Sequence, residues 1–301
     1  MHETGSAMSG EKVQAPNQAA SAAPSAEIAG LDPERDYERI VFLLSYQLFP
    51  WDVERSLEFA LLNTYAIPSI SGLLARTGEF TRRARKRYDD TELLLAEIGE
   101  NGFASAPAGE ALERINEMHG RFRIANDDYR YVLSTFVFNP IDWMAEYRRP
   151  FTANEQQAWL RYYQELGRRM GIGDIPETLD AFRLFRERFE VERMIYATSN
   201  REVSDVTIDL VLGMYVPRFL YPLGRPVAMA LCSGRLVAAI GARQPPRWLR
   251  AVVHSSMRLR GWLLGLSPEP KRLRRITRRR NPTYPDGYEI AGLGVLRPGR
   301  D

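Results

Sequence analysis

The stretch "FTANEQQAWLRYYQELGRRMGI" (151–172) has the pattern of a complete helix. Thr152 and Glu155 stand at capping-box spacing, in which each side chain accepts a hydrogen bond from a backbone N–H of the other residue. Gly171 is a typical residue for a helix end, because glycine adopts the left-handed conformation without strain. We expect a helix between these residues.

Similar signals occur on both sides of this stretch. Asp32 is a good N-cap, and Pro33 suits the first position of a helix. Thr178 is the N-cap expected for a helix that buries Phe182, Phe185 and Phe189. Further helices are expected to break near Pro68, to begin around Thr91, to stop near Pro140, and to occur two or three times between Val203 and Leu266.

The sequence predicts an all-α protein, since no alternating β pattern recurs at the spacing that a sheet requires. Residues 1–30 are rich in Ala, Ser, Gly and Pro without periodicity, which predicts a disordered N-terminal tail. We expect a single helical domain over residues 31–266. Residues 267–301 form a basic segment containing Pro and Gly, which we expect to pack on that domain.

Composition excludes several classes of site. The single cysteine, Cys232, rules out an intramolecular disulfide framework and any site built from several cysteines. The chain contains no HExxH motif, Walker loop or Gly-x-Ser-x-Gly elbow. It also shows no secretory signal, and no apolar run reaches the roughly 20 residues of a spanning helix. A cytoplasmic protein, soluble or attached peripherally to a membrane, is the expectation.

His119 is one of only three histidines, and it follows Leu112 and Ile115 at helical spacing. One interpretation is a packed core histidine whose ring nitrogens bond to the backbone or to a neighbour. The other is a single axial ligand, because a haem needs only one protein imidazole and an apolar pocket between helices. The residues alone leave both interpretations open.

Charge is distributed unevenly along the chain. Residues 201–301 hold 18 basic and 7 acidic residues, a net charge of +11, whereas residues 1–200 carry a net charge of −8. Within the segment 247–280, arginines alternate with Trp248, Trp262 and aliphatic residues. This pattern fits a helix at the surface of an anionic membrane. A nucleic-acid patch, or the basic face of an ordinary helix, would use the same residues.

The basic run "RRARKRYDDT" (82–91) also has two interpretations. It is either a solvated helix start capped by Asp89 or Asp90, or part of a pocket wall. In the second case Arg87 and Thr91, four residues apart, share one helical face.

Several stretches, taken in order, resemble the MpaB/rubber-oxygenase superfamily of haem b oxygenases related to latex-clearing protein, and the MpaB-type branch in particular. They are "AIPSISGLLARTGEF", "KRYDDT", "INEMHGRFRIANDDYRYVLSTFVFNPIDW", "RRPFTANEQQAW", "LGRRMGIGDIP" and "YPDGYEIAGLG". The resemblance implies a helical fold around one haem b, whose iron is bound by the histidine that matches His119. It also implies oxygen-dependent attack on a hydrophobic substrate.

Rubber oxygenases carry an Arg-x-x-Lys-Thr motif on the distal side of the haem, and Arg87, Asp90 and Thr91 occupy the matching positions. The lysine is thus replaced by Asp90, so either another group or water fills the position of the lysine, or Asp90 takes a different acid–base role, and the resemblance does not extend to rubber cleavage itself. The resemblance therefore predicts His119 as metal ligand, Arg87 as a cofactor-binding residue, and Arg87, Asp90 and Thr91 as catalytic residues. Aromatic residues are expected to line a substrate channel, namely Phe136, Phe138 and Trp143.

The function predicted from all of this is a haem b-dependent oxygenase acting on a hydrophobic substrate, such as an isoprenoid or a lipid, with dioxygen. The alternative is a non-catalytic helical protein that carries haem or binds a membrane surface. Peripheral contact with an anionic membrane through residues 247–280 is expected, and no nucleic acid is expected as a partner.

Overall fold

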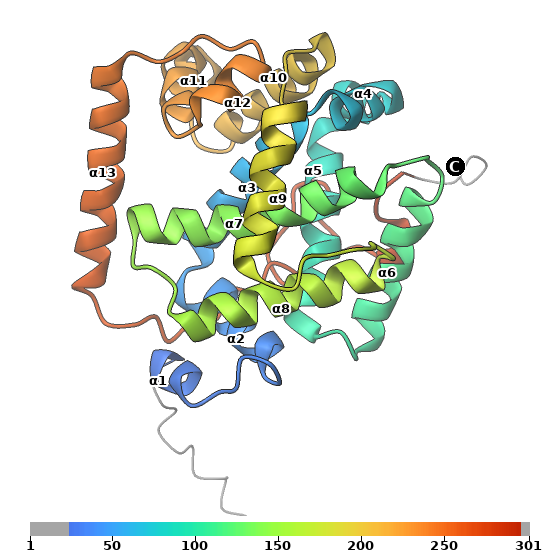
Figure 1. The fold of residues 1–301 in the computed structure, drawn as a ribbon, viewed down its shortest axis with the longest axis vertical. Helices are drawn as coiled ribbons and strands as arrows, with labels where there is room; N and C mark the ends of the chain where they lie inside the picture. The colour runs from blue at the N-terminus through green and yellow to red at the C-terminus, as the bar shows by residue number, and fades with distance from the viewer. Residues whose placement is uncertain (1–23, 296–301) are drawn as a thin grey trace, which may run out of the picture.

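Helices make up the regular secondary structure of the computed structural model, which describes residues 24–295 apart from the side chain of Thr81 (Figure 1). No strand occurs among these residues, so the all-α prediction is confirmed. Two short 3₁₀ turns, η2 (Arg218–Leu220) and η3 (Ile290–Gly292), and one π-helical turn, η1 (Leu44–Leu48), accompany the α-helices. The α-helices are α1 (Pro24–Ala29), α2 (Tyr37–Leu43), α3 (Pro50–Tyr65), α4 (Pro68–Thr77), α5 (Glu79–Asn101), α6 (Ala106–His119), α7 (Asn126–Tyr147), α8 (Ala153–Arg169), α9 (Leu179–Arg193), α10 (Thr198–Gly213), α11 (Tyr221–Ala230), α12 (Gly234–Ala239) and α13 (Arg247–Gly265).

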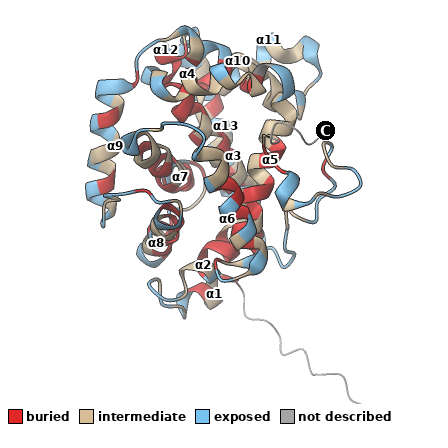
Figure 2. Cartoon of the chain, turned by 90° about the vertical axis from the view of Figure 1, so that its right-hand side faces the viewer, coloured by how far each residue is buried: buried red, intermediate tan, exposed pale blue. Residues whose placement is uncertain are grey.

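Helix α7 passes through the middle of the molecule and packs against α3, α8 and α9 (Figure 1). Its side chains Tyr131 and Phe138 are fully buried, as is Trp159 of α8. Figure 2 shows buried residues along the inward faces of these helices and exposed ones on the outer turns. A second, smaller apolar cluster joins the C-terminal end of α3 to helices α10–α12.

The capping signals correctly located two helices. Thr152 and Glu155 form the complete capping box of α8, and the Thr178 hydroxyl accepts from the backbone N–H of Ala181 at the start of α9. Asp32, by contrast, is not an N-cap. It lies in the turn before α2, where its carboxylate accepts from the backbone N–H of Glu34 at 2.8 Å.

Helix α7 continues through Pro140, where the sequence predicted a stop. Proline has no N–H, so the carbonyl oxygen of Phe136, one turn earlier, loses its partner within the helix. The indole N–H of Trp159 donates to that oxygen at 3.1 Å. A contact with the neighbouring helix therefore replaces the missing bond, which no local sequence rule can anticipate.

Helix α5 begins at Glu79 rather than around Thr91, so the basic run 82–91 lies inside a helix that is kinked at Arg83 (φ −141°, ψ 43°). Asp89 and Asp90 pair with the basic residues one turn earlier, at 2.9 Å and 2.7 Å, and cap nothing. Such pairs at i, i+4 spacing support a helix.

Other boundaries also differ. Residues 24–29 form α1, and Ile28 is buried, so the prediction of disorder through residue 30 is wrong for this part; residues 1–23 lie outside the described residues. Among the described residues between Val203 and Leu266, four α-helices (α10 to α13) occur in whole or in part, rather than two or three.

The described part of the C-terminal segment, residues 267–295, returns along α5 and α6 (Figure 1). Its hydroxyl groups donate to four carboxylates of α5: Thr283 to Asp89, Tyr284 to Asp90, Tyr288 to Glu97, and Thr277 to Glu100. Arg114 of α6 donates to two carbonyl oxygens near its end, those of Leu293 and Val295, each at 2.7 Å. This segment thus covers the acidic side of α5.

Within residues 24–295, no single helix is long and apolar enough to cross a bilayer. Helices α3 and α4 reach the required length and hydropathy only when counted together, and they meet at a bend of 96°.

Candidate functional site

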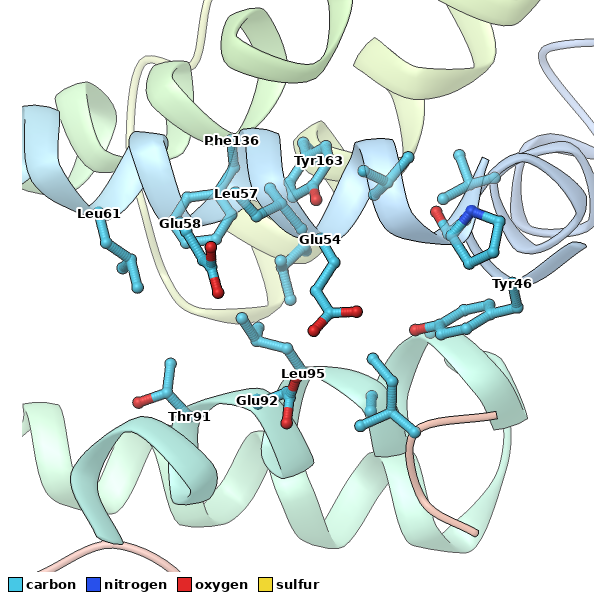
Figure 3. Close-up of a pocket in the computed structure, with 18 of the residues that line it drawn as sticks. Tyr46, Glu54, Leu57, Glu58, Leu61, Thr91, Glu92, Leu95, Phe136 and Tyr163 are labelled. Atoms are coloured by element: carbon cyan, nitrogen blue, oxygen red, sulfur yellow. The ribbon is translucent and has the colours of Figure 1, made fainter. Parts of the chain in front are cut away.

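A largely apolar cleft lies between α3 and α5, with α7 and α8 behind it (Figure 3). Its cavity volume is about 120 Å³, which is smaller than the roughly 300–1,000 Å³ of pockets that enclose drug-sized molecules. Leucine, valine and aromatic side chains form most of the wall. The residues labelled in Figure 3 are Tyr46, Glu54, Leu57, Glu58, Leu61, Thr91, Glu92, Leu95, Phe136 and Tyr163.

One end of the cleft is shaped by the π-helical turn η1. Such a turn adds one residue to a helix and is frequent at functional sites. It directs Tyr46 toward α5, where the phenol oxygen lies 2.5 Å from the position that a Cβ at Gly99 would take. Glycine at position 99 is therefore required for this close approach.

Glu58 is the main polar group in the wall of the cleft. It is 9 % exposed, and it accepts a hydrogen bond from the Tyr88 hydroxyl at 2.7 Å and pairs with Arg55 at 2.9 Å. Burial raises the pKa of Glu58 to about 7, although Arg55 and Tyr88 oppose the shift. A carboxyl group with this pKa can both give and accept a proton near neutral pH.

Two further carboxylates, Glu54 and Glu92, face each other across the cleft from α3 and α5. Arg279 of the C-terminal segment joins them, at 3.4 Å to Glu54 and 2.6 Å to Glu92. Burial raises the pKa of Glu92, while Arg279 acts to lower it. The guanidinium of Arg279 thus links the two walls and the C-terminal segment.

Arg87 and Thr91 lie one turn apart on α5, as expected. The Arg87 guanidinium donates to the Thr91 hydroxyl, which in turn donates to the Arg87 carbonyl oxygen at 2.9 Å. Thr91 lines the cleft. This pair therefore presents a hydroxyl group, supported by a positive charge, at the cleft wall.

His119 is the last residue of α6, which packs beside α5. Burial and, to a lesser extent, the nearby charge of Arg87 lower the pKa of His119 to about 4, so the imidazole is neutral near pH 7. Its Nδ1 is buried and has no hydrogen-bond partner among the described residues, and the Tyr129 ring contacts it edge-on at 5.5 Å. His119 is not among the residues that line the cleft, but Arg87 connects the two places because it approaches both His119 and Thr91.

Asp90 lies elsewhere, although it is the neighbour of Thr91 in sequence. Its carboxylate pairs with Lys86 at 2.7 Å and accepts from the Tyr284 hydroxyl, and it is 2 % exposed. The structure therefore brings together His119, Arg87 and Thr91, but it places Asp90 under the C-terminal segment instead of at the cleft.

Of the three aromatics expected along a substrate channel, only Phe136 lines the cleft. Phe138 is 1 % exposed and packs edge-on against Phe182 in the core. Trp143 is buried as well, and its indole N–H donates to Asp52 at 3.2 Å. The expectation is wrong for these two because α7 turns their side chains away from the cleft.

Sequence reasoning missed Glu58. The signal was a lone acidic residue within the apolar run "LEFALL" (57–62). A charged side chain is seldom buried unless it is paired, as Glu58 is with Arg55. Among residues 24–295, no group of three or more His, Cys, Asp or Glu side chains is arranged to hold a metal ion.

The fold and the cleft define a class of all-helical proteins built around a small-molecule site. Residues 60–278 match the family described as "ER-bound oxygenase mpaB/B'/Rubber oxygenase, catalytic domain", and the chain belongs to this family. It is therefore a member of an oxygenase, and hence oxidoreductase, family, as the resemblance predicted.

Three fungal proteins are similar to this chain. The ER-bound oxygenase mpaB of Penicillium roqueforti (strain FM164) is 29 % identical over 211 residues, which cover 64 % of this chain and 70 % of that protein. The ER-bound oxygenase mpaB' of Penicillium brevicompactum is 27 % identical over 242 residues, covering 74 % of this chain and 57 % of the relative. The ER-bound oxygenase mpaB of the same species is 29 % identical over 184 residues, which cover 55 % of this chain and 47 % of that protein.

Proposed function

We propose that this protein is a haem b-dependent oxygenase that acts on a hydrophobic substrate, with His119 as the axial ligand of the iron. Membership of an oxygenase family supports the reaction class. The observation that carries the haem assignment is the state of His119: a partly buried, neutral imidazole whose buried Nδ1 has no hydrogen-bond partner among the described residues. A core histidine ordinarily satisfies its buried nitrogens, whereas an axial ligand must be neutral and available.

When bound, a b-type haem would supply the iron at which dioxygen is activated. His119 would hold this group, and Arg87, whose charge acts on His119, would orient Thr91, since the two side chains are already hydrogen-bonded. Thr91 would offer its hydroxyl to a polar atom at the cleft wall. Glu58 would store or release a proton, because its pKa of about 7 places both protonation states within reach.

Asp90 has no place in this mechanism. Its carboxylate is occupied by Lys86 and Tyr284 on the other side of α5. We assign it to the attachment of the C-terminal segment.

The cleft favours an uncharged, apolar substrate. Its wall is mostly leucine, valine and aromatic surface, for example Leu57, Leu61 and Phe136. An anionic group is disfavoured there because Glu58 and Glu92 already resist ionisation through burial. An isoprenoid or lipid chain fits this description.

Such a substrate gathers in lipid rather than in water. The relatives are named ER-bound, and we infer that this chain takes its substrate from a membrane surface, to which it attaches peripherally from the cytoplasmic side.

The first test is an ultraviolet–visible spectrum of the haem-reconstituted protein beside His119→Ala, with His254→Ala as the matched control. We expect a Soret band at one haem per chain in the wild type and in the control, and its loss or a clear shift in His119→Ala. Stoichiometric haem with an unchanged spectrum in His119→Ala would disprove the ligand assignment. Absence of haem from the wild type would favour the non-catalytic alternative.

A second measurement separates an enzyme from a haem carrier. Dioxygen uptake is followed for the loaded protein with an isoprenoid alcohol, and with a straight-chain alcohol as the comparison. Substrate-dependent uptake that Thr91→Val diminishes supports an oxygenase. Haem binding without uptake on either substrate supports a carrier.

A further inference from the structure

Helix α13 turns its most apolar side toward solvent. It lies along one edge of the molecule (Figure 1). Trp248 is 66 % exposed and Trp262 62 % exposed, and both fall on the same helical face as Val252, Leu259 and Leu266, which are exposed too. These five residues are the apolar stripe of α13. Their spacing of four, seven, three and four residues keeps them on one side of a helix with 3.6 residues per turn.

The opposite side of α13 is bound to the domain by polar groups and by two apolar residues, the buried Val253 and the partly buried Met257. His254 contacts the Tyr147 hydroxyl through Nδ1 and the Ala230 carbonyl oxygen through Nε2, each at 3.1 Å. Arg260 pairs with Asp52 at 2.8 Å. A surface helix of a soluble protein normally has the reverse arrangement, with its apolar stripe inward. Packing of α13 against the core therefore does not explain why these apolar residues face solvent.

A close backbone contact between α13 and the end of α7 fixes the orientation of α13. A Cβ at Gly261 would lie 1.7 Å from the Tyr147 carbonyl oxygen, so α13 and the end of α7 touch backbone to backbone there. Arg148 donates to the Gly261 carbonyl oxygen at 2.9 Å. Rotation that would bury the stripe is thus opposed by the contacts on the inner side.

The surroundings of the stripe are positively charged. From Leu210 to Pro268 the sequence has no aspartate or glutamate and has eight arginines. Arg247 and Arg258 are exposed on one side of the stripe, where Arg258 also pairs with Glu146, and Arg218, Arg235 and Arg243 are exposed on the preceding elements. Helix α11, which packs against α13, adds the exposed apolar residues Leu223 and Val227.

We propose that the apolar stripe of α13 docks flat on an anionic lipid bilayer, with its tryptophans at headgroup depth and the flanking arginines on lipid phosphates and carboxylates. Tryptophan favours that depth because its ring is apolar and its N–H is polar. Arginine near an anionic surface adds electrostatic attraction.

A second copy of this chain is a poorer occupant, because pairing two such faces would bring arginines against arginines. A nucleic acid would use the arginines but would leave the aliphatic stripe in water. The bilayer is the one partner that satisfies both the charge and the apolar surface.

This inference refines the proposed function by naming the surface through which substrate is collected. The two can fail separately, because vesicle binding needs neither haem nor turnover. The stripe would also hold α11 and α12 close to the lipid.

The test is flotation of the full chain with two kinds of vesicle: phosphatidylcholine alone, and phosphatidylcholine with about a third phosphatidylserine. We expect strong binding to the second kind. Trp248→Gln with Trp262→Gln should lower the partition coefficient by about tenfold or more, since each indole buries part of its 150–250 Å² in lipid. The control is Leu184→Gln with Val191→Gln, which changes two exposed apolar residues on α9 and should bind as the wild type does.

Helical content and the unfolding midpoint verify that both double variants fold. Equal binding by the wild type and the tryptophan variant, or binding to neither vesicle, would overturn the proposal. So would a concentration-dependent dimer that the tryptophan variant abolishes, because the stripe would then be a self-interface. A salt-sensitive shift of duplex DNA without flotation would likewise reject the bilayer as partner.

Discussion

Glu58 should make the stability of the protein depend on pH. Its pKa is about 7 in the folded protein, against a usual value of 4.5, so the folded state binds the proton more tightly than the unfolded chain. Stability from this group is present below about pH 4.5 and is lost as the pH rises through about 7. Between about pH 5 and about pH 8 this loss amounts to about 2.5 kcal/mol of the free energy of unfolding.

The measurement is urea unfolding of the wild type and of Glu58→Gln at these two pH values. The amide keeps the shape of the carboxyl group and can still accept from Tyr88, but it does not titrate. We expect the free energy of unfolding of the wild type to fall by about 2.5 kcal/mol more than that of Glu58→Gln over this range. Comparing the change with pH removes any constant effect of the substitution.

Glu177→Gln is the matched control, since Glu177 is exposed in the loop before α9. It should follow the pH dependence of the wild type. Parallel curves for the wild type and Glu58→Gln would refute the reasoning, because they would mean that the Glu58 carboxyl is hydrated or already ionised in the folded state.

Three other substitutions test other parts of the structure. Asp90→Asn should lower the free energy of unfolding, measured in urea, by about 2–3 kcal/mol because it breaks a buried hydrogen bond to a charged group. It should leave the Soret band unchanged. Gly261→Ala should detach α13, since its Cβ would meet the Tyr147 carbonyl oxygen at 1.7 Å, and cleavage by a protease in the loop before α13 would report this. Arg279→Ala should lower the melting temperature by about 2–4 °C, corresponding to about 1 kcal/mol, whereas Arg278→Ala on the exposed side should not.

Local sequence signals were reliable where the structure is itself local. The capping box of α8 involves residues three apart, so Thr152 and Glu155 identified it without tertiary information. The predicted helix end near Pro140 was wrong because the hydrogen bond that replaces the missing one is not local. Its donor is the indole N–H of Trp159, on another helix. The start of α5 was misplaced because the basic run was taken as solvated, while its partners stand one turn later in the same helix.

The site shows the same division. Arg87 and Thr91 were found because helical spacing places them together. Asp90 stood in the right position for a family motif, but its carboxylate is taken by Tyr284, which is 194 residues away in sequence. Glu58 could not be assigned to the cleft wall from the sequence, because the cleft forms only where α3 and α5 face each other. Long-range contacts of this kind place Asp90 and Glu58, and helical spacing alone does not predict them.

The attachment of the C-terminal segment to α5 has a consequence for synthesis on the ribosome. The carboxylates of Asp89, Asp90 and Glu97 receive their hydroxyl partners from residues that lie 191 to 194 positions later in the chain. At about 5–20 residues per second, that interval takes roughly 10–40 s. During this time these acids of α5 keep their partners within the helix but lack their hydroxyl partners, and the cleft wall on the other side of α5 is incomplete. The nascent protein therefore completes its site only after the final helix has emerged, and a chaperone would meet α5 before its covering segment exists.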